Sequence, residues 1–358
     1  MRQSGLFGLS EHLKRLSANG DPLEELNHLI DFEIFRPALV TALSYGDGSR
    51  GGRPPYDAVA MFKVLILAAQ NNVSDARMEY LIRDRLSWLR FLGFDLGAAT
   101  PDANTIRMFR ERLTQAGAMD PLFAAFDLEL KTRGYLAMGG QIVDATLVAA
   151  PKQRNTDAEK AAIKEGKTAA EIWPDEPARA AQKDVDARWT LKFAKGRPAA
   201  NGKPQIDIAI PSFGYKSSIS ICRAFGFIRK GKVTDGARFD GRMLRDVVTN
   251  DNTASDVWAD TAYRSQSNEK WLKARGRVSR VHRRKPRGKP MPDHIRRGNA
   301  TKSKVRARVE HVFAQQKANM GMLIRTIGIK RAEAKITLVN LAYNMNRLIF
   351  HERRAPMA

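Results

Sequence analysis

The spacing of hydrophobic residues changes twice along this chain, and that change constrains the fold more than any other feature. Residues 1–134 carry apolar side chains at helical spacing, as in the segment YDAVAMFKVLILAAQ. Isoleucines stand two positions apart at Ile206, Ile208 and Ile210 and again at Ile219 and Ile221, which indicates strands. The helical period returns from Arg308 onward. An all-helical domain (1–134) is therefore expected before an α/β domain (135–358) with a mixed sheet flanked by helices.

Helix start signals divide the first 134 residues into several short helices. Asp21 followed by Pro22 and Glu24 predicts an N-cap with a capping box. The segment from Ser74 to Gly93 is predicted as one helix, and Thr100 with Pro101 as the start of another. Short helices joined by polar turns are typical of a compact DNA-binding module, although a purely structural helical domain is the alternative.

Two segments interrupt the α/β pattern. Residues 151–204 have mixed charge with Ala, Gly and Pro, and we expect a charged insertion after the first strand with one helix beginning at Thr156. Residues 273–308 hold fifteen Lys and Arg against a single acid, Asp293. A solvated basic loop is the default interpretation of such a run.

The net charge predicts the kind of partner. The chain has 61 Lys and Arg against 38 Asp and Glu, a formal charge of +23. Such an excess favours nucleic acid, and the competing anionic membrane would call for a basic amphipathic helix or lipid anchor, neither of which is evident. The single Cys222 and the scattered histidines exclude a disulfide framework or a cysteine-based zinc site. With no signal-peptide pattern, we expect a cytoplasmic, nucleoid-associated protein and no membrane partner.

Three acids lie in positions that suggest chemistry. Asp144 sits inside an apolar strand, where a carboxylate is costly unless it is paired, bound to a cation or bonded to a nearby amide. Asp260 is expected where a short strand ends, and Glu310 lies four residues after Arg306 on a helix. The rivals Asp240 and Asp256 lie in turn-like sequence.

A metal site explains this set of acids better than separate structural roles. A surface pair of Arg306 with Glu310 would contribute only about 0–1 kcal/mol. Three converging carboxylates repel one another unless cations neutralise them, and oxygen ligands without His or Cys favour Mg²⁺ or Mn²⁺. Two such ions can activate water for phosphodiester cleavage.

The three acidic segments also resemble a known family. VDATLVAAPKQRN, ADTAYRS and RARVEHVFAQQK look like the acidic motifs of DDE transposases from bacterial insertion sequences. They are most similar to the family named for insertion sequence five, within the group related to insertion sequence four. That group's last motif, Tyr-x2-Arg-x3-Glu-x6-Lys, is matched by Arg306, Glu310 and Lys317, whereas Ser303 replaces the tyrosine. Ala262 stands before Tyr263 where the family usually has glycine. The resemblance covers roughly residues 50–350.

The resemblance implies a fold, a reaction and partners. The fold would be RNase H-like, and the activity Mg²⁺-dependent cleavage at terminal inverted repeats followed by strand transfer into target DNA. Two Mg²⁺ ions, replaceable by Mn²⁺, would be held by the catalytic Asp144, Asp260 and Glu310. Double-stranded DNA would be bound by a homodimer, through the residues Arg306, Lys317, Lys152, Arg154, Tyr263 and Arg264.

Several alternatives remain at the level of sequence. Lys152, Arg154 and Arg264 fit a solvated surface equally well. Trp189 fits a core or hinge position better than a stack on an unpaired base. The whole protein is alternatively a transposase-derived DNA-binding protein without catalysis, or an RNase H-like nuclease that does not join strands. A basic RNA-binding scaffold is less favoured, since the aromatic-rich RNA motifs are missing.

Overall fold

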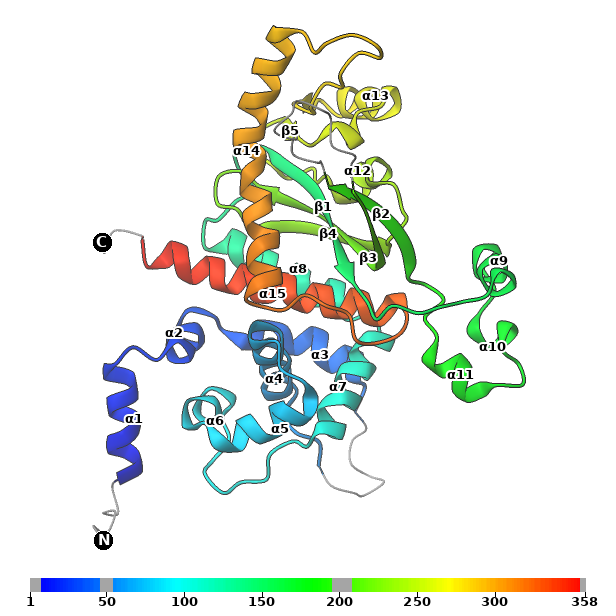
Figure 1. Ribbon diagram of the computed structural model, residues 1–358. Helices are drawn as coiled ribbons and strands as arrows, with labels where there is room; N and C mark the ends of the chain where they lie inside the picture. Colours follow the sequence, from blue (N-terminus) through cyan, green and yellow to red (C-terminus); the bar gives the residue numbers. More distant parts are fainter. Residues whose placement is uncertain (1–7, 46–53, 195–207, 355–358) are drawn as a thin grey trace, which may run out of the picture. The chain divides into compact units, whose positions relative to one another are not determined.

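The computed structural model describes residues 8–45, 54–194 and 208–354, and these form two compact units (Figure 1). The first unit comprises residues 1–136, 318–321 and 337–358, and the second comprises 137–317 and 322–336. Residues from Thr337 onward group with the first unit because they bond to it: Asn346 accepts from Gln70 at 2.9 Å, and Glu352 accepts from Tyr135 at 3.0 Å.

The described part of the first unit is helical. Asp21 caps its helix as predicted, but Glu24 pairs with Arg90 at 3.2 Å. The segment beginning at Ser74 is not one helix, because the chain is extended at Arg85 and a second helix starts there. The Thr100 start was wrong, since Asp102 provides the cap. The helical elements are α1 (Gly8–Ala18), α2 (Pro22–Leu29), η1 (Phe32–Phe35), α3 (Arg36–Leu43), α4 (Ala58–Asn71), α5 (Asp75–Asp84), α6 (Leu86–Leu92), α7 (Ala103–Gln115) and α8 (Met119–Thr132).

Helix α4 forms the centre of this unit. Ten of its fourteen residues are buried, so it is apolar on nearly all sides, as expected of a core helix. Phe62 of α4 lies 4.7 Å from the ring of Phe35, which is 6.3 Å from that of Phe126. These fully buried rings join α4 to η1 and α8.

The second unit is built on a six-stranded mixed sheet, which confirms the expected α/β class. The order is β2-β3-β1-β5-β6, and β4 pairs with residues 215–221 of β3, the same half of that strand that pairs with β1. The central strand β1 is antiparallel to β3 and parallel to β5. The strands are β1 (Gln141–Ala149), β2 (Arg188–Ala194), β3 (Ile208–Cys222), β4 (Ile228–Asp235), β5 (Asp256–Trp258) and β6 (Val278–Ser279).

Close backbone packing sets β1 beside β5. Gly140, just before β1, has φ of +91°, and a Cβ there would lie 2.4 Å from the Trp258 ring and 2.6 Å from the carbonyl oxygen of Asp256. Asn252 bonds both backbone groups of Gly140, accepting at 2.9 Å and donating at 3.0 Å. A glycine is therefore required where the two strands meet.

Within the segment 151–204, the described residues 151–194 hold more structure than the single predicted helix. Three short helices follow β1: α9 (Asp157–Glu165), α10 (Ala169–Ile172) and α11 (Pro177–Gln182). The predicted capping box of Thr156 and Glu159 is confirmed. Strand β2 then occupies part of the range assigned to the insertion, because its residues pair with β3. We call residues 157–182 the helical excursion.

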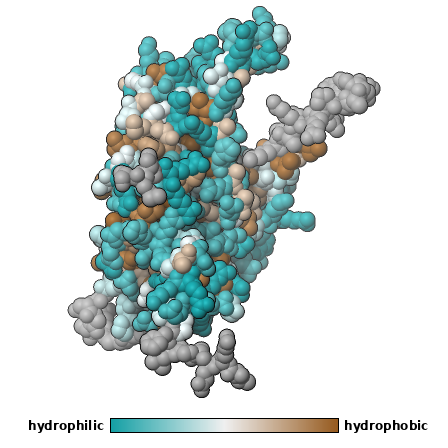
Figure 2. Space-filling view, turned by 90° about the vertical axis from the view of Figure 1, so that its left-hand side faces the viewer, coloured by the Kyte–Doolittle hydropathy of each residue, from teal (hydrophilic) through white to brown (hydrophobic). Residues whose placement is uncertain are grey.

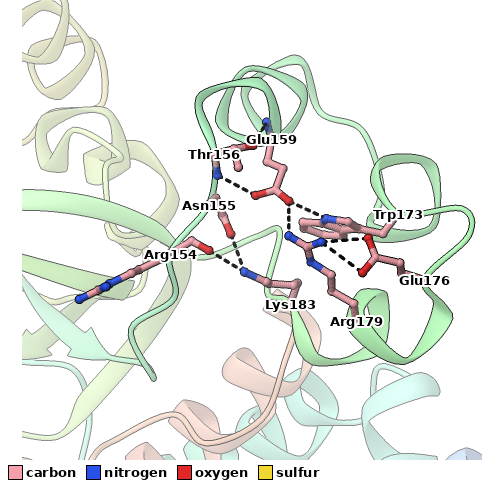
Figure 3. A network of polar contacts seen from close by, with 8 residues as sticks. All are labelled: Arg154, Asn155, Thr156, Glu159, Trp173, Glu176, Arg179 and Lys183. Carbon is pink, nitrogen blue, oxygen red and sulfur yellow. Dashed lines mark hydrogen bonds and ion pairs between the residues drawn. The ribbon is translucent and has the colours of Figure 1, made fainter.

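The helical excursion is held by its own polar network around Trp173 (Figure 3). The carboxylate of Glu159 accepts from the Trp173 indole at 2.8 Å and from Arg179 at 2.6 Å. At its base, the Lys183 ammonium donates to the Arg154 carbonyl at 2.6 Å and to Asn155 at 3.0 Å. The excursion is thus a small structured body attached to the sheet.

The basic segment 273–308 is not a continuous loop. It contains the end of α13 (Gln266–Ala274), strand β6 and the first half of α14 (Asp293–Ala318). Helix α14 begins fifteen residues before the point at which the apolar period returns. Its early turns are mostly polar and exposed, so hydrophobic spacing could not mark them. The remaining elements are η2 (Asp240–Met243), α12 (Leu244–Val247), η3 (Thr261–Tyr263) and α15 (Ile329–Glu352).

Candidate active site

Asp144 is a nearly buried carboxylate in the middle of β1. Its side chain is 14 % exposed and accepts from the Arg306 guanidinium at 2.8 Å and from the Ala145 amide at 2.9 Å. Burial raises the pKa of Asp144, the Arg306 charge and the Ala145 amide oppose that rise, and the charge of Asp260 adds to it. Asp144 and Asp260 are therefore electrostatic neighbours.

Asp260 follows the next parallel strand. Strand β5 ends at Trp258, two residues earlier than expected, and Asp260 is the N-cap of η3. Its carboxylate accepts from the Ala262 amide at 2.8 Å. Strands β1 and β5 are adjacent and parallel. Asp144 on β1 and Asp260 just after β5 therefore lie on neighbouring segments of the chain. This is the sheet position at which site residues gather in open α/β folds.

Arg306 and Glu310 form no isolated surface pair. The Arg306 side chain is only 14 % exposed and its guanidinium binds Asp144, while the nearest Glu310 oxygen lies 4.0 Å from the same nitrogen. Glu310 itself is 64 % exposed. Helix α14 thus places a cation between the first and third acids of the sequence pattern.

The three carboxylates fit a site for a divalent cation only in part. Asp144 and Asp260 provide oxygen ligands whose mutual repulsion a cation would relieve. Glu310 does not join them, and the described residues contain no group of three His, Cys, Asp or Glu side chains arranged to hold a metal ion. Arg306 takes the place beside Asp144 that a cation would otherwise fill.

The other sequence candidates divide into two groups. Lys317 lies near the pair, because its ammonium donates to Thr146 of β1 at 2.6 Å. Arg264 is engaged within the unit, with the Val281 carbonyl at 3.1 Å and Glu269 at 3.5 Å. Lys152 and Arg154 are exposed at the root of the helical excursion, and the Arg154 side chain extends away from its network (Figure 3).

Trp189 is not a core residue. It is 44 % exposed on β2, with its ring centroid 5.4 Å from that of Phe213. Of the preferred core or hinge position, the core was wrong, because β2 lies at the end of the sheet order and pairs with one strand only, and the hinge stays a prediction.

Three further residues belong to the surroundings of the aspartates. The buried Tyr263 hydroxyl has no hydrogen-bond partner among the described residues, and burial together with the charges of Asp144, Asp240 and Asp260 raises its pKa. The buried His282 has a lowered pKa from burial and from the Arg306 charge. Sequence reasoning gave Tyr263 only a DNA-binding role, set Asp240 aside and missed His282. The charge on Asp240 beside a buried tyrosine was not visible in sequence spacing.

One face of the molecule carries mainly hydrophilic residues, with scattered hydrophobic ones (Figure 2). No helix in the described ranges has the length and apolar character needed to cross a membrane. A mixed-sheet unit with paired aspartates and nearby cations, joined to a helical unit in a chain of charge +23, is the arrangement of an enzyme that acts on nucleic acid.

Comparison with known families makes the assignment specific. Residues 136–345 match the Transposase DDE domain, and residues 10–112 match the Transposase domain (DUF772). Since the first match covers more than half of the chain, the protein belongs to the DDE transposases, metal-dependent enzymes of insertion sequences that act on DNA. No solved structure matches the chain.

Proposed function

We propose that this protein cuts DNA at the terminal inverted repeats of an insertion sequence and transfers the freed ends into target DNA. The observation that carries the proposal is Asp144 on β1 beside Asp260, which follows the adjacent parallel strand β5, with Arg306 bound to Asp144 at 2.8 Å. It supports phosphodiester chemistry because acids and a cation lie together at the centre of the sheet in a DNA-acting family.

Asp144, Asp260 and Glu310 are the proposed ligands of two Mg²⁺ ions, for which Mn²⁺ can substitute. When bound, the ions would supply an activated water and charge stabilisation at the leaving oxygen. The Arg306 charge opposes the rise that burial gives to the pKa of Asp144, and Arg306 has to release that carboxylate for Glu310 to join the aspartates. Arg306 then lies free to bind a phosphate.

The remaining residues orient the DNA backbone. Lys317, held at 2.6 Å from Thr146, is positioned beside β1 to contact a phosphate. Lys152, Arg154, Tyr263 and Arg264 would contribute further contacts along the strand. In the first step water displaces the 3′-oxygen at the element's end. In the second step the freed 3′-hydroxyl attacks a target phosphodiester and displaces its 3′-oxygen, so the number of phosphodiester bonds is conserved and no nucleotide cofactor is consumed.

We also propose the finer placement of the fold and assembly. A central β1 antiparallel to β3 and parallel to β5 supports an RNase H-like catalytic domain. The motif match supports the family named for insertion sequence five. Residues 1–134 would bind the terminal repeats, and a homodimer would join the two ends of the element.

The test uses single neutral substitutions at the three acids. Asp144→Asn, Asp260→Asn and Glu310→Gln should each bind terminal-repeat DNA yet fail to cut it with Mg²⁺ or Mn²⁺. Asp256→Asn is the matched control, because Asp256 lies on β5 but pairs outward with Arg280 at 2.7 Å. Full cleavage by any one of the three variants removes that residue from the proposed site.

A strand-transfer assay separates the remaining alternatives. Joining of a labelled, pre-cut end to plasmid DNA identifies a transposase, whereas cutting without joining identifies a nuclease. Binding of terminal repeats without either reaction identifies a DNA-binding protein that has lost catalysis.

A further inference from the structure

His282 is a buried imidazole that follows the last strand of the sheet. Its side chain is 8 % exposed, and the ring atom Nε2 has no hydrogen-bond partner among the described residues. A buried polar atom without a partner is costly, so folded proteins contain few of them and each one calls for an explanation. The surroundings of His282 supply that explanation.

The backbone holds His282 beside Asp260. Strand β6 runs parallel to β5, and the pairing continues beyond both strands, since the His282 amide donates to the Ala259 carbonyl at 3.0 Å. On the other side, the Lys302 ammonium of α14 donates to the carbonyl of Val281 at 3.0 Å. Residues 281 and 282 are thus tied both to the segment before Asp260 and to α14.

The charges that act on the His282 ring decide what its Nε2 can do. They are those of Arg306 and Lys302 on α14 and, with the opposite sign, that of Asp260 before η3. Burial and the two cations lower the pKa of His282, so the ring is neutral at pH 7. A neutral imidazole has one N–H donor and one acceptor nitrogen, and arginine and lysine side chains can only donate. Facing these cations, Nε2 is therefore an acceptor.

Arg306 holds a donor that matches this acceptor. Its Nη2 binds Asp144 at 2.8 Å, but its buried Nε–H has no partner among the described residues. Because both Nε2 of His282 and Nε of Arg306 are closed off from solvent, each has to find its partner inside the protein. A displacement of the Arg306 side chain away from Asp144 would let the two atoms bond.

We propose that His282 is a positioning residue for Arg306, whose Nε–H it binds through Nε2 once DNA draws the guanidinium away from Asp144. Arg306 then has two positions. Without DNA, its Nη2 binds Asp144 and its Nε–H is unpaired. With DNA, His282 holds the Nε–H and the outer nitrogens face the phosphate. This inference rests on the proposed function, since it concerns the contact between arginine and phosphate in the same site.

The experiment pairs a substitution in the protein with one in the DNA. The full chain is titrated in Ca²⁺ with terminal-repeat DNA whose cleavage-site phosphate is either normal or an uncharged methylphosphonate. His282→Leu removes the acceptor and should weaken binding of normal DNA about 10- to 150-fold, which corresponds to about 1.5–3 kcal/mol for a hydrogen bond to a charged group. Binding of the methylphosphonate DNA should not change, because it offers Arg306 no charge.

Companion variants separate positioning from direct DNA contact and from folding. His282→Gln should bind normal DNA tightly, since its Oε1 can replace Nε2 as the acceptor, whereas the shorter His282→Asn should behave as His282→Leu. In an Arg306→Lys background, which keeps the charge but lacks the Nε–H, His282→Leu should have no further effect. His294→Leu, at an exposed histidine of α14, should behave as wild type.

Thermal unfolding without DNA gives a second measurement. Because Nε2 of His282 has no partner in the DNA-free protein, His282→Leu should unfold at the same temperature as wild type. A lower unfolding temperature together with equal weakening of both DNAs would identify a purely structural residue and overturn the inference.

The remaining outcomes distinguish the inference from the proposed function. If wild type binds and cuts terminal-repeat DNA and His282→Leu keeps its preference for the normal phosphate, the positioning role is wrong and the proposed function stands. A further loss caused by His282→Leu in the Arg306→Lys background would show that His282 acts on the DNA itself, which also overturns the inference. If wild type binds no DNA, the proposed function and the positioning role both fail.

Discussion

Removing Arg306 should leave Asp144 as a buried, uncompensated charge. Both side chains are 14 % exposed and their atoms are 2.8 Å apart, so solvent screens the pair weakly. Breaking such a pair from one side costs about 3–5 kcal/mol. Because Asp144 keeps the Ala145 amide at 2.9 Å, we expect Arg306→Met to lower the free energy of unfolding by about 3 kcal/mol at pH 7.

The pH dependence distinguishes the ion pair from lost packing. The pKa of Asp144 is already raised by burial, so folding favours its protonated form. That contribution to stability is complete below the unfolded-state pKa and is lost as pH rises through the folded-state pKa. Arg306→Met raises the folded-state pKa of Asp144 further. The stability difference from wild type should therefore be small near pH 3.5 and grow toward pH 7.

The assay is urea unfolding followed by tryptophan fluorescence without divalent ions, since four of the five tryptophans lie in the second unit. The double variant Asp144→Asn with Arg306→Met should recover much of the loss, because no buried charge remains. Arg296→Met is the matched control: it removes an exposed pair on α14, with Arg296 and Asp293 71 % and 68 % exposed. A cost below about 1 kcal/mol, or one that does not vary with pH, would refute the reasoning.

Three substitutions test the packing around the site and the excursion. Gly241→Ala should destabilise the protein by about 1–3 kcal/mol in urea unfolding, because its Cβ would lie 2.4 Å from the Ala262 oxygen; a neutral effect contradicts this. Asn268→Ala should lower the free energy of unfolding by about 2 kcal/mol in the same assay, since the carbonyls of Gly241 and Tyr263 lose their donor. An unchanged midpoint would show that these two hydrogen bonds add little stability. Trp173→Ala removes the buried centre of the helical excursion and should open residues 157–182 to limited proteolysis; equal resistance to wild type would show that the network is dispensable.

The sequence predicted the elements whose signals are local. The apolar run around Asp144 identified β1, because a central strand buried on both faces needs continuous hydrophobic residues. The alternating isoleucines identified β3, although Ile208 and Ile210 at its start are exposed. The capping box of Thr156 and Glu159 identified the start of α9, because its signal lies within four consecutive residues. The first half of α14 was missed since its mainly polar residues carry no apolar period.

The site was only partly predictable. Asp144, Asp260 and Arg306 were singled out by unusual residue types in their context; in the structure Arg306 binds Asp144 at 2.8 Å, and the charge of Asp260 raises the pKa of Asp144. Sequence spacing pairs Arg306 with Glu310, whereas in the structure Arg306 binds Asp144 at 2.8 Å and lies 4.0 Å from Glu310, because tertiary packing brings β1 against α14.

The base of the helical excursion has a consequence for how this chain can be modified. The Gln153 side-chain amide bonds both backbone groups of Asp184, at 2.7 and 2.9 Å, and Lys183 ties back to Arg154. These contacts close the stem without using any residue of 157–182. The stem is thus a natural junction at which that body can be exchanged for a short linker or a fluorescent reporter. The number of residues between the two aspartates is accordingly a poor guide to whether related chains share the same chemistry.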